Sequence, residues 1–271
     1  MASSQHSDDI EKASVEKGRT EHRDRVRPIS VALTPEQYER LFLEPGGKAP
    51  PVSKLSKQFG NPTPLAIMVF TLCLAPTACI LLGWAGADPT SMVTMLAPFY
   101  FQGGIGLIVS SILEWILGNT FSYVVFMLFG GFWLAFGAIN DPSIGIGASY
   151  AASGGAASPA FNSALMWYFA FFAVIAVILF VASLRTNVVF AFIFLTLIVI
   201  LVLFSASYGR MTVGDVNGAV KLSKAAGGVC LATSAAGFYL TIVLIFGCVE
   251  MPFHLPVGDL SGVAFVKKKT A

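Results

Sequence analysis

The chain has 271 residues, of which 55% are hydrophobic and 12% are charged, and its formal net charge is +2. A water-soluble domain typically carries about 25% charged residues, and most of the charges here lie near the two ends of the chain. The composition therefore predicts an integral membrane protein that sits in a lipid bilayer. The sequence has no basic stripe interleaved with aromatic residues, so no nucleic-acid partner is predicted.

The first 58 residues are polar and contain no apolar run of the kind that a signal peptide needs. Their Ser, Glu, Lys and Arg content predicts a disordered tail over 1–58. Lys54 and Lys57, just before the first apolar stretch, favour a cytoplasmic position for this tail. Residues 251–271 are predicted to form a second cytoplasmic tail, which leaves 59–250 as the membrane domain.

Six apolar stretches approach the length of about 20 residues with which a helix crosses a bilayer. They are 64–83, 92–113, 121–139, 165–184, 188–206 and 227–248. None alternates like a barrel strand, so the predicted fold class is all-α, a six-transmembrane-helix bundle. Tight cytoplasmic connections are expected at 118–120 and 185–187, and external loops at 140–163 and 207–226. The basic residues of the 207–226 loop argue against this orientation, but those of the tails offset them.

The four cysteines all lie in apolar stretches with no metal-ligand spacing, and the three histidines lie outside those stretches. We therefore expect free thiols, no metal site and no cofactor. The membrane part contains no paired acids and no Ser–His or Cys–His set, so an enzyme is not predicted.

Three of the four tryptophans fall near the ends of predicted spans, where tryptophan often anchors a helix at the membrane surface. These are Trp84, Trp115 and Trp167. Trp133 lies deeper and is predicted to be a packing residue. Small residues at 103–111, 129–133 and 227–237 predict close contacts between helices.

Each odd-numbered helix is preceded by an asparagine, at Asn61, Asn119 and Asn187. Asparagine is a strong helix cap, and proline, which follows Asn61, suits a first helical turn. Two interpretations remain open. The three caps could be unrelated, or they could mark three helical-hairpin repeats around one central pathway. In the second case the three helix N-termini would attract a carboxylate at the cytoplasmic mouth.

Four motifs, taken in order, resemble a known family. They are "NPTPLAIM", "FYFQGGIG", "LEWILGNTF" and "GGFW". They are similar to the signatures of the acetate uptake transporters, also called succinate–acetate permeases, and the long tail resembles that of the fungal members. The resemblance implies a six-helix subunit with its own pathway, a homo-hexamer in the plasma membrane, and a small carboxylate moved together with protons.

The resemblance also implies a hydrophobic constriction formed by Phe70, Phe129 and Leu195. They follow the three asparagines by nine, ten and eight residues, respectively. The expected substrate pathway and helix starts comprise Asn61, Pro62, Thr63, Pro64, Asn119, Thr120 and Asn187. Glu114 is interpreted either as a structural hydrogen-bond partner at a helix end or as a proton-related group.

The chain departs from the family pattern at several positions in or near this pathway. Ala66 stands where the family has glycine, Leu107 where it often has glutamine, and Met127, Leu128 and Phe129 where it has a polar triplet. Each change removes a hydrogen-bonding group or narrows the path. The leading hypothesis is proton-linked transport of acetate and similar short monocarboxylates. The alternatives are a non-transporting or sensing membrane protein, and a channel or exporter for another small solute such as ammonium.

Overall fold

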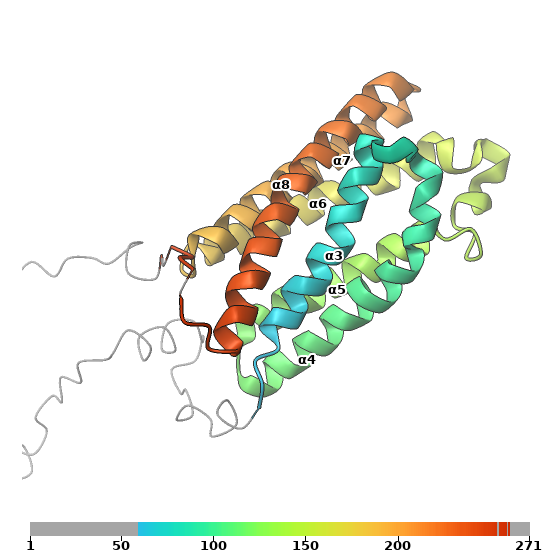
Figure 1. Ribbon diagram of the computed structural model, residues 1–271. Helices are drawn as coiled ribbons and strands as arrows, with labels where there is room; N and C mark the ends of the chain where they lie inside the picture. The colour runs from blue at the N-terminus through green and yellow to red at the C-terminus, as the bar shows by residue number, and fades with distance from the viewer. Residues whose placement is uncertain (1–58, 254, 259, 261–271) are drawn as a thin grey trace, which may run out of the picture. The chain divides into compact units, whose positions relative to one another are not determined.

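The computed structural model describes residues 59–253, 255–258 and 260, which form a bundle of helices (Figure 1). The predicted tail 1–58 and most of the predicted tail 251–271 lie outside the described residues. Six helical segments are long and apolar enough to cross a membrane, which confirms the predicted fold class. They are α3 (Thr63–Leu82), η4 with α4 (Pro98–Gly106 and Leu107–Leu117), α5 (Thr120–Asn140), α6 (Pro159–Ser183), α7 (Val188–Thr212) and α8 (Val216–Cys248).

Successive spans run in opposite directions, so the bundle has two distinct ends (Figure 1). We call the end that carries Thr63, Gly118 and Asn187 the motif end. The opposite end, where the chain turns at 83–97, 141–158 and 213–215, is the loop end. Helix α8 packs along both α3 and α7, α6 packs along α7, and α5 packs along the continuous pair η4 and α4.

Glycines bring the backbones of neighbouring helices close together, as the small-residue stretches predict. A Cβ atom on Gly237 of α8 would lie 2.2 Å from Oγ1 of Thr71 on α3, and one on Gly130 of α5 would lie 3.1 Å from the Gly104 carbonyl oxygen. Because such positions leave no room for a side chain, glycine allows the helices to pack directly against each other.

The second span differs from its predicted bounds of 92–113. It begins at Pro98 with a π-helical segment and ends at Leu117, where Gly118 adopts a left-handed conformation with φ of 85°. The preceding residues Pro89–Met95 instead form a short 3-10 helix, capped by the Asp88 side chain. Glu114, predicted to lie between two spans, is inside α4 and fully buried.

The predicted external loop at 207–226 is wrong, because α7 and α8 together cover all of it except three residues. Asp215 makes the sharp turn possible. Its Oδ1 atom accepts a hydrogen bond from the Gly218 amide at 2.8 Å, and its Oδ2 atom lies 3.6 Å from Nη1 of Arg210. Both helices therefore extend beyond their most apolar segments.

The predicted loop at 140–163 is also shorter than expected. Two 3-10 segments, η5 (Gly147–Ser153) and η6 (Gly155–Ala157), occupy much of it. Helix α6 begins at Pro159 because the Ser158 hydroxyl accepts a hydrogen bond from the Phe161 amide at 3.2 Å.

The described residues beyond α8 fold back onto the motif end. The Val188 amide in the first turn of α7 donates to the Gly258 carbonyl oxygen at 2.8 Å, and the Leu260 amide donates to the Thr186 carbonyl oxygen at 3.0 Å. The Tyr239 hydroxyl of α8 donates to the Pro256 carbonyl oxygen at 2.6 Å. The bond from the Val188 amide satisfies one of the amides that a helix N-terminus leaves free. The other two bonds hold the same segment against α8 and the residue before Asn187.

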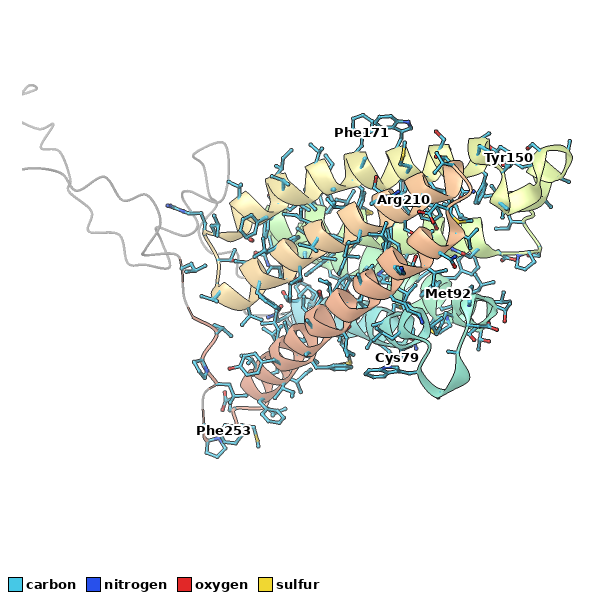
Figure 2. All side chains as sticks on the ribbon, turned by 90° about the horizontal axis from the view of Figure 1, so that it is seen from above. Cys79, Met92, Tyr150, Phe171, Arg210 and Phe253 are labelled. Carbon is cyan, nitrogen blue, oxygen red and sulfur yellow. The ribbon has the colours of Figure 1, made fainter. Side chains whose placement is uncertain are left out.

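The outer faces of the spans carry many exposed apolar side chains. Phe171 on α6 points away from the bundle and is 67% exposed (Figure 2). In water such a surface would favour aggregation. In a bilayer, lipid chains can cover it, which agrees with six membrane-spanning helices.

Candidate functional site

Glu114 joins the first and third helix starts at the motif end. Its Oε1 atom accepts a hydrogen bond from the Thr63 hydroxyl at the start of α3. Its Oε2 atom accepts one from Nδ2 of Asn119, which precedes α5, at 2.6 Å. The carboxyl group is fully buried, and hydrogen bonds of this kind are needed to keep a buried polar group stable. The side chain thus links the NPTP and GNT motifs, which are far apart in sequence.

The three asparagines play different structural roles, although their sequence context predicts similar caps. Asn187 accepts from the Phe190 amide at 2.8 Å and caps α7 as predicted. Asn61 accepts from the Thr63 amide at 3.0 Å, which forms a turn just before α3. Asn119 makes no side-chain cap on α5 and donates to Glu114 instead. The prediction of three equivalent caps is therefore wrong for Asn61 and Asn119, because Pro62 is the N-cap residue of α3 and neither asparagine side chain caps its helix.

Three cavities follow one another along the interior of the bundle. The motif-end cavity and the middle cavity each have a volume of about 30 Å³ and share walls formed by Phe70, Phe129 and Leu197. The vestibule at the loop end has a volume of about 940 Å³ and shares Phe136 and Phe204 with the middle cavity. The interior therefore forms a row of spaces separated by two groups of apolar side chains.

Phe70 and Phe129 come together as the family resemblance implies. Both are buried, and their rings meet edge to face with centroids 5.7 Å apart. Leu195 does not join them. Its side chain is 46% exposed, and the α7 residue that shares their cavity walls is Leu197. Leu197 therefore occupies the position beside Phe70 and Phe129 that the resemblance implies for Leu195.

The motif-end cavity contains three of the departures from the family pattern. Ala66, Leu107 and Phe129 all line it, together with further apolar side chains. The other two departures lie elsewhere: Leu128 packs against the hydrophobic core and Met127 is half-buried. At these three positions the departures from the family pattern put apolar side chains on the wall of the motif-end cavity.

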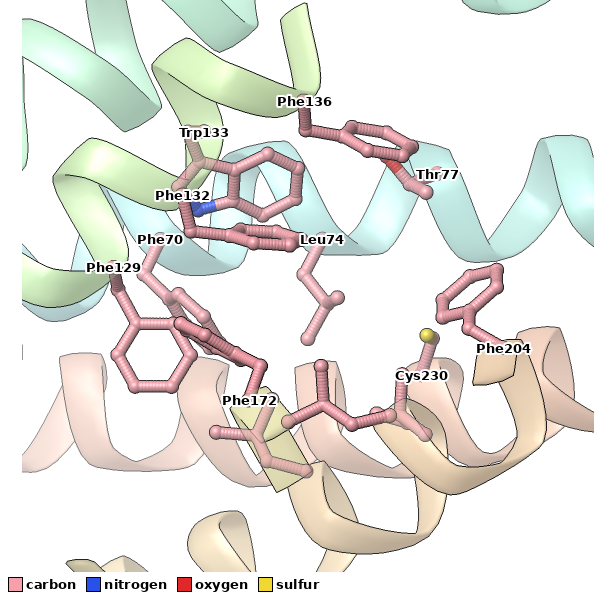
Figure 3. A pocket seen from close by; sticks show the side chains of 13 residues that line it. Phe70, Leu74, Thr77, Phe129, Phe132, Trp133, Phe136, Phe172, Phe204 and Cys230 are labelled. Atoms are coloured by element: carbon pink, nitrogen blue, oxygen red, sulfur yellow. The ribbon is translucent and has the colours of Figure 1, made fainter. Parts of the chain in front are cut away.

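The middle cavity is enclosed by side chains from α3, α5, α6, α7 and α8 (Figure 3). Ten of its thirteen lining residues are Phe, Leu or Ile, and the other three are Thr77, Trp133 and Cys230. The sequence alone did not point to Leu197, Thr77, Phe204 or Cys230, because each lies in a uniformly apolar stretch. Their role as lining residues becomes visible only when the helices are packed.

The vestibule is the polar part of the row. Its lining includes Asp88, Asn140, Asp141, Asn162 and Lys224. The hydroxyl and amide of Thr90 lower the pKa of Asp88 below its usual value. Hydrogen bonds from Ser143 and Tyr100 lower the pKa of Asp141 in the same way. Both carboxyl groups therefore remain charged and hydrated at neutral pH at the loop end.

Six apolar helices around a row of cavities define an integral membrane protein with an interrupted internal route. The chain belongs to the GPR1/FUN34/yaaH family, whose sequence profile matches residues 43–262. This match confirms the resemblance that the four sequence motifs indicate.

Named relatives and a solved structure agree with this assignment. The chain is 40% identical to protein alcS of Aspergillus fumigatus over 239 residues, which cover 86% of this chain and 87% of that protein. It is 30% identical to acetate permease A of Emericella nidulans over 88% of this chain and 79% of that protein. The bacterial acetate channel SatP shares the fold, with a TM-score of 0.57 and 24% identity over 74% of this chain and 99% of that chain.

Proposed function

We propose that this chain moves acetate and similar short monocarboxylates across the membrane together with a proton. The observation that carries the proposal is the row of three cavities, in which Phe70, Phe129 and Leu197 lie between the motif-end cavity and the middle cavity. The relative named acetate permease and the solved structure named acetate channel support the choice of substrate. They also support a transport protein over an enzyme.

The apolar walls of the cavities are the reason for including a proton in the proposal. A carboxylate that leaves water for an apolar cavity loses several kcal/mol of hydration unless donors replace it. The motif-end and middle cavities are lined almost entirely by apolar side chains. The neutral acid crosses such walls at much lower cost. Each acetate would therefore pass as acetic acid, and one proton would travel with it.

Uptake of labelled acetate into proteoliposomes tests the proposal. With an inward proton gradient we expect faster uptake than without one, and we expect butyrate to be taken up more slowly than acetate. Equal slow uptake in both conditions, from protein that is shown to be folded, would contradict the proposal. That outcome would favour a non-transporting or sensing protein, which the apolar side chains of Ala66, Leu107 and Phe129 would suit.

We also propose a homo-hexamer in the plasma membrane with both termini in the cytoplasm. The support is the resemblance to the acetate uptake transporters and the basic residues that flank the first span. Native mass spectrometry from lipid nanodiscs would measure the number of subunits. A monomer or dimer as the sole species would contradict the hexamer without affecting the proposal of transport.

A further inference from the structure

Among the described residues that line the middle cavity, one strong hydrogen-bond donor has no partner. Of the cavity's three lining residues with a polar atom or sulfur, Thr77 already donates its hydroxyl proton to the Cys73 carbonyl oxygen at 2.8 Å. The Cys230 thiol is a weak donor. The indole N–H of Trp133 remains, and it is a strong donor that has no acceptor function of its own.

Trp133 is buried, and only 2% of its surface is exposed. Among the residues that the structure describes, its Nε1 atom is the one buried side-chain nitrogen or oxygen without a hydrogen-bond partner. A buried donor without a partner is costly and uncommon in native proteins, so it needs an explanation. A partner that visits the neighbouring cavity would provide one.

Neighbouring aromatic rings fix the position of the indole. It stacks on Phe99 with ring centroids 4.9 Å apart, and it packs edge to face with Phe132 and Phe70 at centroid distances of 5.4 and 6.4 Å. In Figure 3 the nitrogen lies on the edge of the ring that is turned toward these two phenylalanines, and both of them line the cavity. The ring that carries the donor is therefore held in place at the wall of the middle cavity.

We propose that Trp133 Nε1–H donates a hydrogen bond to a carboxyl oxygen of a short-chain acid in the middle cavity. This inference rests on the proposed function and assigns a binding position to it. The neutral acid offers its carbonyl oxygen to the indole, while its short alkyl group contacts the surrounding phenylalanine rings. The position lies between the group Phe70, Phe129 and Leu197 and the group Phe136 and Phe204. The acid would pause there between two apolar barriers.

The four tryptophans of the chain allow a direct measurement of this bond. The other three, Trp84, Trp115 and Trp167, are exposed, and replacing them with phenylalanine leaves Trp133 as the single indole. In ¹⁵N-labelled protein at pH 5, sodium acetate should shift the Trp133 indole N–H resonance in a saturable manner. Sodium chloride at equal concentration is the control. An indole resonance that acetate leaves unchanged would overturn the proposal and would assign the bond to a trapped water molecule.

Uptake measurements provide a second test. Trp133→Phe removes the donor and keeps an aromatic ring, and we expect it to raise the acetate concentration for half-maximal uptake about fivefold, the effect of one neutral hydrogen bond. Trp167→Phe, the same change on the outer face, should leave that concentration unaltered. An unaltered value in Trp133→Phe would overturn the proposal.

The two measurements separate this inference from the proposed function. If the unmodified protein takes up no acetate, the proposed function fails, whatever Trp133 does. If it takes up acetate but the indole resonance does not respond, only the binding position fails. The resonance shift is measured without any change at Trp133, so it decides the question even if Trp133→Phe does not fold.

Discussion

Two leucines on α7, two positions apart, have very different surroundings. Leu197 is buried on the wall that the motif-end and middle cavities share, whereas Leu195 is 46% exposed. A helix turns by about 100° per residue, so a step of two residues turns a side chain by about 200° to the opposite face. Helix rotation therefore decides which of the two leucines faces the cavities.

This pair gives a matched test of the constriction. Leu197→Ala should widen it and increase uptake of butyrate relative to acetate, because a smaller side chain leaves more space between Phe70 and Phe129. Leu195→Ala should leave the ratio of the two uptake rates unchanged. Competition between labelled acetate and unlabelled butyrate would measure this ratio. A changed ratio in Leu195→Ala alone would show that the constriction has been misplaced.

Glu114 should contribute to stability through its two side-chain hydrogen bonds. Glu114→Ala leaves Thr63 and Asn119 without their acceptor and opens a buried space, so we expect a loss of about 1–3 kcal/mol in unfolding free energy. Glu114→Gln keeps an acceptor oxygen and should retain most of that stability. Thermal unfolding in detergent would compare the two. Equal melting temperatures for Glu114→Ala and the unmodified chain would refute a structural role.

The sequence alone predicted Phe70 and Phe129 as neighbours but placed the third residue incorrectly. The family resemblance assigns Phe70, Phe129 and Leu195 by their positions relative to the motifs, which fixes how far along a helix each residue lies but not the direction in which its side chain points. In the structure Phe70 lies seven residues after the start of α3 and Leu195 lies seven residues after the start of α7, yet Phe70 is buried and Leu195 is exposed. A family motif therefore locates the helix, but contacts with neighbouring helices decide which side chains face inward.

At the scale of elements, local hydrogen bonds determine where the helices end. Hydropathy predicted six spans correctly but missed that α7 and α8 continue through the polar stretch at 207–226. The Asp215 cap and the left-handed Gly214, with φ of 76°, compress the turn between them into three residues. A window average of hydropathy cannot detect this, because it responds to apolar content and not to capping.

Asp141 follows α5 and makes side-chain hydrogen bonds at its end, as Asp215 does at the start of α8. Its contribution to the stability of the folded chain should depend on pH. It accepts hydrogen bonds from the Ser143 hydroxyl at 2.6 Å and from the Tyr100 hydroxyl at 3.0 Å. These bonds lower its pKa below the ordinary value of 3.8. A carboxyl group whose pKa is lowered on folding stabilises the folded state above that ordinary value, and the contribution is lost as the pH falls through the folded pKa.

Asp141→Asn mimics the protonated carboxyl group in shape. We therefore expect the unmodified chain to melt at a higher temperature than Asp141→Asn at pH 6, and the difference to shrink as the pH falls below about 4. Thermal unfolding across pH 3–6 in one detergent would measure it. A difference that stays constant over this range would mean that the ionised form of Asp141 makes no special contribution.

At the scale of the whole molecule, the two ends of the bundle differ in character. The loop end opens into a vestibule of about 940 Å³ whose lining includes charged side chains, and the motif end has an apolar cavity of about 30 Å³. We take the large vestibule as the entrance of the route. For acids that enter from outside the cell, the vestibule should then face outward and the motif end should face the cytoplasm. The basic residues of the N-terminal segment favour the same orientation.

Cysteine labelling can test this orientation with groups already in the chain. Cys248 ends α8 at the motif end and is exposed, whereas Cys73 and Cys230 are buried and Cys79 on α3 is half-buried, so the labelling is done in a Cys79→Ser background. A membrane-impermeant maleimide should therefore label Cys248 only after the cells are permeabilised. Ser149→Cys, at an exposed position of the loop end, should be labelled in intact cells under the proposed orientation, in which the vestibule faces outward. Labelling of Cys248 in intact cells, confirmed by its loss in Cys248→Ser, would reverse the orientation and place the vestibule in the cytoplasm.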